Sequence, residues 1–263
     1  MALLVASCGV EVSVSETESI SETAAEAPTT APPPAVEVEF VTPDTTSPAI
    51  VESDDSPRQG TVVARAAAPG ELVAYTDAAE SSEQVAVLTD PVKNGGALVL
   101  QVITPVGGSI PEWLEVRLPV RPNGTTGWIK SNTVDLSLNP YRVEITTSEF
   151  RLDLFKNDEL VSTTSIAVGT GETPTPYGEF FLAELLQPSS PDGAYGPFAF
   201  GLSGFSDVIY SFAGGDGVIG IHGTNQPEVI GTEVSHGCVR VENEFIEDMA
   251  SIVPLGTPVT IQH

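Results

Sequence analysis

The feature that most constrains the fold is an alternation of short apolar runs with Gly, Pro and Asn, which continues from about residue 60 to the end of the chain. The runs TVVARA, LVAYT, VAVLT, ALVLQVI, WLEVRLP and TGWIKS have β-like composition. Asn123-Gly124, in RPNGTTGWI, is a strong signal for a tight turn. The sequence therefore predicts a mainly β protein.

Two folded parts are expected, at residues 60–138 and 140–263. The first reads as a small all-β barrel, in which Trp113 and Trp128 are expected to pack in the core rather than line a ligand groove. The second begins with the apparent meander RVEITTSEFRLDLFKNDELVSTTSIAVG, with a turn at KND, and continues with the expected strands EFFLAELL, DVIYSF and GVIGIHG.

One helix is predicted at about residues 243–253. Its apolar residues fall on one face at helical spacing, Asn243 is the expected N-cap and Gly256 lies just past the end. Those apolar residues are Phe245, Ile246, Met249, Ile252 and Val253. The fold class is therefore a β-sheet domain with one or two short helices, preceded by a small β-barrel.

The first 59 residues have a different composition. MALLVASC, residues 1–8, resembles the end of a bacterial lipobox, in which Cys8 would be lipid-modified; the apolar stretch is short and lacks a preceding Lys or Arg, so we expect the natural start upstream. Residues 9–59 are rich in Ser, Thr, Glu, Pro and Ala and carry charge of a single sign until Arg58, which predicts a disordered linker. Together they suggest a stalk that holds the folded parts away from a membrane.

The charge of the chain excludes one class of partner. The formal net charge is −26, and nucleic acid binding needs clustered Lys and Arg, so we expect no nucleic acid partner. The chain has only two cysteines, which rules out a disulfide framework.

The segment GIHGTNQPEVIGTEVSHGCVRVEN brings His222, His236 and Cys238 together within seventeen residues. One interpretation is a zinc site, but neither C-x-x-C nor H-E-x-x-H spacing is present, so no metal is expected. Another is a buried cysteine with two core histidines, which the clustering disfavours. We favour nucleophilic catalysis, because a thiol needs a nearby base and His222 lies on a separate strand from which it can approach Cys238.

Neighbouring residues fit a nucleophile. Gly237 allows the tight backbone needed to direct amide N–H groups at an oxyanion. Arg240 lies two residues after Cys238, so in an extended strand both side chains would share a face, where a guanidinium could hold a carboxylate.

The residues Ser235-His236-Gly237-Cys238-Val239-Arg240, with His222 upstream, resemble the signature of the L,D-transpeptidase catalytic domain of YkuD type. VGTGETPTPYGEF resembles the family's Gly-rich segment, and the likeness covers about residues 140–263. The segment WLEVRLPVRPNGTTGWIKSNTVDL resembles the end of a bacterial SH3-like domain.

The resemblance implies a role for each residue of the motif. Cys238 would attack the amide before the terminal D-Ala of a peptidoglycan stem tetrapeptide, and His222 would be the base, positioned by the carbonyl of Gly223. Backbone N–H groups of His236, Gly237 and Cys238 would form the oxyanion hole. D-Ala would leave, and an amine of a second stem would take the acyl group from the thioester.

Other residues have less defined roles under the same resemblance. Arg240, Ser235 and Tyr210 are the candidate substrate-binding residues, although Ser235 reads as structural and Tyr210 fits core packing equally well. His236 is the least certain member of the site. The alternatives are an L,D-carboxypeptidase that uses water as acceptor and a non-catalytic wall-binding lipoprotein.

The expected setting follows from these features. No cofactor is expected, because the acyl group passes from amide to thioester to amide. The partners would be donor and acceptor stem peptides, with a membrane reached through lipid on Cys8. The protein is expected to be an extracytoplasmic monomer, inactivated by carbapenems that acylate the same thiol.

Overall fold

The computed structural model describes residues 38–40, 60–107, 109–211 and 215–263. The expected lipobox with Cys8, and all of the expected linker except Val38–Phe40, lie outside the described residues. Within the described ranges, no helix is long and apolar enough to cross a membrane.

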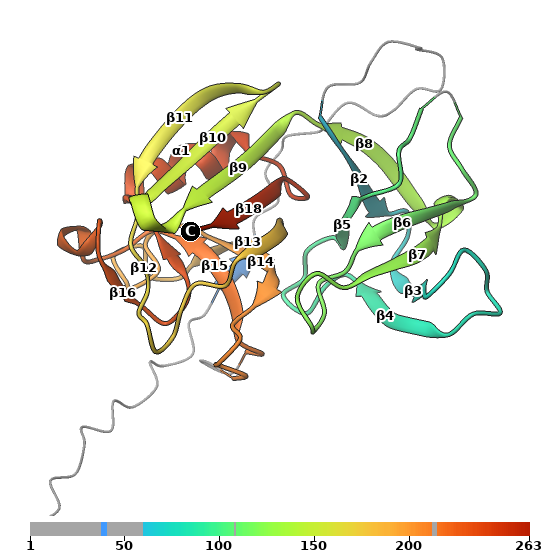
Figure 1. The fold of residues 1–263 in the computed structure, drawn as a ribbon, viewed down its shortest axis with the longest axis horizontal. Coiled ribbons are helices and arrows are strands. Elements are labelled where there is room, and N and C mark those ends of the chain that lie inside the picture. The colour runs from blue at the N-terminus through green and yellow to red at the C-terminus, as the bar shows by residue number, and fades with distance from the viewer. Residues whose placement is uncertain (1–37, 41–59, 108, 212–214) are drawn as a thin grey trace, which may run out of the picture. The chain divides into compact units, whose positions relative to one another are not determined.

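The first described sheet covers residues 61–139 and has seven antiparallel strands in the order β4-β3-β7-β6-β5-β2-β8 (Figure 1). The strands are β2 (Thr61–Ala66), β3 (Gly70–Tyr75), β4 (Gln84–Asp90), β5 (Val99–Val102), β6 (Trp113–Arg117), β7 (Thr126–Lys130) and β8 (Val134–Asn139), with a 3-10 turn at Ser131–Thr133. In β6 and β7 every second residue is buried, which is the pattern of strands with one face on a core. The six apolar runs of the sequence are confirmed as strands.

The second sheet has the order β11-β10-β9-β18-β13-β14-β15-β17, and β1 pairs with β13. Its strands are β1 (Val38–Phe40), β9 (Tyr141–Thr146), β10 (Arg151–Lys156), β11 (Glu159–Ser165), β13 (Gly178–Pro188), β14 (Ala199–Phe205), β15 (Val218–His222), β17 (Val239–Arg240) and β18 (Pro258–Gln262). A separate parallel pair joins β12 (Val168–Gly169) to β16 (Glu233–Ser235), and 3-10 turns lie at Thr147–Glu149 and Pro227–Val229. This part of the chain is also mainly β.

Strand β13 holds the second sheet together. Gly178–Phe181 pair with β18, and the following residues pair with β14 from Leu182 onward. Its last three residues, Leu186–Pro188, pair with β1, which lies in the stretch expected to be a linker. The strand therefore continues from the meander half of the sheet to the half that carries β14, β15 and β17.

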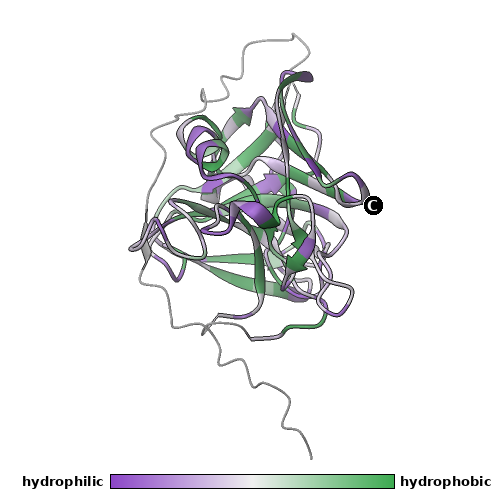
Figure 2. Cartoon of the chain, turned by 90° about the vertical axis from the view of Figure 1, so that its left-hand side faces the viewer, coloured by the Kyte–Doolittle hydropathy of each residue, from purple (hydrophilic) through white to green (hydrophobic). Residues whose placement is uncertain are grey.

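Helix α1 (Asn243–Ile252) confirms the predicted helix. It buries Ile246, Met249 and Ala250 in the same core as the sheet, and it carries both hydrophobic and hydrophilic residues in Figure 2. The predicted N-cap is wrong, because Glu242 occupies that position. The Asn243 side chain is used elsewhere: its Oδ1 accepts a hydrogen bond from the backbone N–H of Thr224 at 2.7 Å.

In the segment DVIYSF, the described residues Asp207–Ser211 form no strand, contrary to the sequence prediction. Strand β14 ends at Phe205, and the Oγ of Ser206 accepts hydrogen bonds from the backbone N–H groups of Val208 and Ile209. A serine that binds the backbone two and three residues ahead favours a turn over a continued strand. Tyr210 therefore lies in the connection between β14 and β15.

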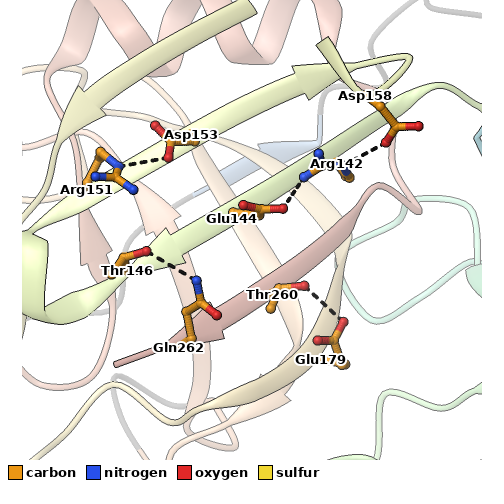
Figure 3. A network of polar contacts seen from close by, with 9 residues as sticks. All are labelled: Arg142, Glu144, Thr146, Arg151, Asp153, Asp158, Glu179, Thr260 and Gln262. Carbon is orange, nitrogen blue, oxygen red and sulfur yellow. Dashed lines mark hydrogen bonds and ion pairs between the residues drawn. The ribbon is translucent and has the colours of Figure 1, made fainter. Parts of the chain in front are cut away.

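One face of the meander carries a network of polar contacts (Figure 3). Arg151 pairs with Asp153, and Arg142 pairs with Asp158 and Glu144. Alternate residues of β9, such as Val143 and Ile145, are buried, so the strand has a core face and a polar face.

Candidate active site

Strands β15 and β17 bring His222 and the Cys238 segment together. They pair in parallel, with Ile221 opposite Val239 and His222 opposite Arg240. Cys238 directly precedes β17, which places it level with Gly220 on β15, and the Cys238 thiol contacts the backbone of Gly220. His222 and Cys238, sixteen residues apart in sequence, thus come from neighbouring segments and line one cleft.

His222 is held in one tautomer. It is 5% exposed, and its Nδ1 lies 2.6 Å from the carbonyl oxygen of Gly223. A carbonyl only accepts hydrogen bonds, so Nδ1 carries the proton and Nε2 is left as the acceptor. Burial lowers the pKa of His222 to about 4, against a smaller opposing effect of the Gly223 carbonyl. The imidazole is therefore neutral at neutral pH.

Cys238 is partly exposed and is a free thiol. Burial raises the pKa of Cys238, and the Gly220 backbone and the charge of Arg240 oppose this rise. Both shifts disfavour a preformed thiolate–imidazolium pair. The resting state is a neutral thiol beside a neutral imidazole, which can take the thiol proton as the nucleophile attacks.

Ser235 shapes the segment that carries Cys238. Its buried hydroxyl donates to the carbonyl of Cys238 and accepts from the backbone N–H of Gly237 at 3.1 Å. Gly237 has a φ of 111°, which L side chains rarely adopt. The structure places Ser235 against the backbone, and the Gly237 N–H, one of the expected oxyanion donors, is directed at its Oγ.

The Gly-rich segment supports this turn from behind. The Thr173 hydroxyl donates to the carbonyl of Ser235 at 3.0 Å, and the Thr170 N–H donates to the same oxygen. Gly169 lies where a Cβ would come within 2.2 Å of the Thr173 carbonyl, so only glycine fits that approach. The segment VGTGETPTPYGEF was singled out by its resemblance to the family, but its contact with Ser235 was not predicted.

Arg240 lies opposite His222 and donates to the Gln226 side chain at 3.3 Å. Its Nε is buried and, among the described residues, makes no hydrogen bond. Its charge lowers the pKa of both Cys238 and His222. Arg240 is not among the described residues that line the cleft shared by His222 and Cys238. Its charge therefore affects these two residues from outside the cleft.

Cys238 and His222 line a cleft of about 870 Å³. Its walls include residues of β13, β14 and β15, and also Val87–Thr89 of β4. Tyr195, which sequence reasoning missed, lines the cleft as well and lies with its ring 4.8 Å from the His222 ring. Its one sequence signal was an aromatic residue in the Gly- and Pro-rich loop PDGAYGPF.

Two predicted site residues lie apart from this group. Tyr210 is 70% exposed, and the guanidinium of Arg121 lies over its ring at 4.6 Å from the centroid. It is absent from the described lining of the cleft. His236 is exposed, so the structure gives it no buried place beside the thiol.

The sequence comparisons with known proteins concern the second half of the chain. Residues 140–261 match the family described as the L,D-transpeptidase catalytic domain, YkuD. The YkuD proteins of Bacillus licheniformis and Bacillus subtilis, both named as L,D-transpeptidases, are 42% and 38% identical over 122 residues. Each match covers 46% of this chain and 66% of the relative, so the chain spans slightly less than two thirds of their length.

Among solved structures, one neighbour is L,D-transpeptidase 3 from Mycobacterium tuberculosis in complex with a faropenem-derived adduct. The match covers 76% of this chain and 97% of that chain, with 14% identity and a TM-score of 0.41. The sequence comparisons cover the strands and the loop that hold His222 and Cys238. By sequence, residues 140–261 of this protein are therefore similar to the L,D-transpeptidase catalytic domain of YkuD type.

Proposed function

We propose that the protein is a peptidoglycan L,D-transpeptidase that works through a thioester on Cys238. The observation that carries the proposal is that His222, with Nδ1 bound to the Gly223 carbonyl, and Cys238 line one cleft where β15 pairs with β17. The free Nε2 is the only ring atom of His222 that can accept the thiol proton. The proposed substrate and acceptor are those expected for the family whose model residues 140–261 match.

The proposed reaction transfers an acyl group from one amide to another through a thioester. Nε2 of His222 takes the proton from the Cys238 thiol as the sulfur attacks the carbonyl carbon that joins the third stem residue to D-Ala. The C–N bond breaks, the proton passes to the leaving nitrogen, and D-Ala departs. An amine of a second stem then attacks the thioester, its proton returns to sulfur through His222, and a new amide replaces the C–S bond.

The developing oxyanion needs N–H donors. In the structure the Gly237 N–H is directed at Ser235, so we assign the backbone N–H of Cys238 as the principal donor, with His236 and Gly237 as further members of the expected set. Arg240 supports the attack by Cys238, because its positive charge favours the thiolate. We propose that it also attracts the carboxylates of the stem peptide.

The test is product analysis with purified muropeptides. Wild type should release D-Ala and form cross-linked dimers, and Cys238→Ala and His222→Ala should form neither. The matched control is His263→Ala, which changes an exposed histidine outside the cleft. Tripeptide without dimers would make the enzyme an L,D-carboxypeptidase, and equal products from Cys238→Ala would overturn the enzymatic proposal.

A second readout isolates the thiol. Intact mass after incubation with a carbapenem should show one covalent adduct on wild type and none on Cys238→Ala. An adduct that survives Cys238→Ala would contradict the assignment of the nucleophile.

We also propose an extracytoplasmic location with a lipid anchor on Cys8 and an SH3-like character for residues 60–138. The seven antiparallel strands support a small β domain in front of the catalytic one. Labelling with a fatty acid should mark wild type and Cys238→Ala equally and should be lost in Cys8→Ser. Unlabelled wild type would overturn the anchor without touching the catalytic proposal.

A further inference from the structure

We infer that Tyr195 is a positioning residue whose ring covers the imidazole of His222 and keeps water from it, so that the base stays neutral. The inference rests on the proposed role of His222 as the base. It assigns a task to the loop between β13 and β14, which lies outside the motifs quoted from the sequence.

The loop that carries Tyr195 is fastened to the backbone beside His222. Gly196 has a φ of 65°, and a Cβ on it would lie 2.7 Å from the Cα of Gly223. The N–H of Gly223 donates to the carbonyl of Phe198 at 3.3 Å. Because the carbonyl of Gly223 accepts from His222 Nδ1, the same residue anchors both the base and the loop that covers it.

The helix reinforces this anchor. Asn243 Oδ1, which accepts from the N–H of Thr224, lies where a Cβ on Gly196 would come within 2.5 Å. The β13–β14 loop therefore meets the end of β15 and the start of α1 at Gly196, where there is no room for a side chain. Such close backbone contact leaves Tyr195 little freedom to move away from the cleft.

The ring contact places the Tyr195 ring, in a tilted arrangement, against the imidazole of His222. The centroids of Tyr195 and His222 are 4.8 Å apart and the planes are tilted by 55°. This separation is within the range of favourable contacts between aromatic rings. Burial raises the pKa of Tyr195, with a further rise from Cys238, so its phenol is uncharged at neutral pH.

Few charged groups face His222. Arg240 faces it from β17, Cys238 from the segment before β17 and the phenol of Tyr195 from the β13–β14 loop. Of these, only Arg240 is charged at neutral pH, and its effect is smaller than that of burial. Removing the Tyr195 ring removes no charge. It should therefore change the pKa of His222 by letting water reach the imidazole.

The experiment titrates the three histidines of the full chain by NMR with labelled histidine, in wild type, Tyr195→Phe and Tyr195→Ala. In wild type His222 should titrate near pH 4. Tyr195→Ala should raise that pKa by about one unit or more, toward the ordinary value of 6.5, because water reaches the ring. Tyr195→Phe should leave it unchanged, since the ring and not the hydroxyl provides the cover.

The matched control is Tyr177→Ala. Tyr177 is also stacked on a histidine, His263, but on the surface, with centroids 6.1 Å apart. This substitution should leave the titration of His222 unchanged. A second route to the same effect is Gly196→Ala, whose Cβ clash should displace Tyr195 and raise the pKa of His222 as Tyr195→Ala does.

The rate of acylation by a carbapenem, followed against pH, gives the functional readout. The acidic limb of this pH profile should move to higher pH in Tyr195→Ala and should stay at the wild-type pH in Tyr195→Phe. An unchanged His222 titration in Tyr195→Ala, or an equal shift in Tyr195→Phe, overturns the inference. If wild type is never acylated, the proposed function fails, while the NMR titration still decides whether Tyr195 covers His222.

Discussion

At the scale of single residues, burial more than charge sets the protonation of the proposed catalytic pair, His222 and Cys238. His222 and Cys238 both have pKa values displaced toward the neutral form, with burial as the main cause. Two neutral partners are less costly to bury than an ion pair. Both side chains are therefore uncharged at neutral pH, and Arg240 is the nearby fixed charge that favours the thiolate in the proposed reaction.

The buried His222 should make stability depend on pH. Its folded pKa of about 4 lies below the ordinary 6.5, so between these values the unfolded chain binds a proton that the folded chain does not. The free energy of unfolding should fall as pH drops through this window, by about 3 kcal/mol in total. Urea unfolding at pH 7 and pH 4.5 measures this loss, which should shrink in His222→Gln and persist in His263→Ala.

Ser235 should be needed for the shape of the nucleophile segment. Ser235→Ala removes a donor to the Cys238 carbonyl and leaves the Gly237 N–H without this partner in a buried place. We expect a loss of about 1–3 kcal/mol in stability and a fall in kcat larger than the change in KM. Ser251→Ala is the control, because its hydroxyl caps an exposed helix carbonyl; equal effects of both variants would contradict this role.

At the scale of elements, the site is assembled from loops held by short strand pairs. The pair of β12 and β16 sets Gly169 opposite Ser235, and the segment after β12 then reaches the carbonyl of Ser235 through Thr173. The pair of β15 and β17 sets the base opposite Arg240. Each pair is only a few residues long, so its geometry depends on the glycines that allow close approach.

Gly169 offers a direct test of that dependence. Gly169→Ala places a Cβ within 2.2 Å of the Thr173 carbonyl, so the loop must move and its contact with Ser235 should weaken. We expect a lower Tm and slower acylation of Cys238. Gly171→Ala, in the same loop with open space around it, should change neither quantity, and a similar loss there would argue against the steric explanation.

At the scale of the whole molecule, residues 60–263 include two hydrophobic clusters that share strand β13. Most buried residues of β13 pack with the second sheet, but Phe181 packs with the core of the first. The Arg121 guanidinium also donates to the carbonyls of Ser206, Ile209 and Asp216, in the connection between β14 and β15. The first sheet thus contributes contacts to the loop that leads into the strand of His222.

Loss of Arg121 should loosen that connection. Arg121→Ala removes its hydrogen bonds to three carbonyls, together with its contacts on the rings of Phe205 and Tyr210. Hydrogen exchange of residues 205–211 should be faster than in wild type. Arg117→Ala, whose partner Gln101 lies within the first sheet, should leave this segment unchanged, and equal exchange in both variants would contradict the role of Arg121.

The sequence by itself determined the β character, the helix at 243–252 and the likeness of residues 140–263 to a transpeptidase domain. These features are local: strand alternation, helical spacing, turn residues such as Asn157 and Asp158 with their positive φ, and a short motif around Cys238. Each is fixed by neighbours within a few residues, so a pattern can reveal it.

Only the tertiary structure decided how the site is supported. It put Tyr195 over His222, turned the Gly237 N–H toward Ser235 and drew Tyr210 to Arg121 instead of the cleft. The first and last of these contacts join segments dozens of residues apart, and the second depends on how a hydroxyl is oriented inside a buried turn. Packing between distant loops chooses such partners, and no spacing along the chain encodes that choice.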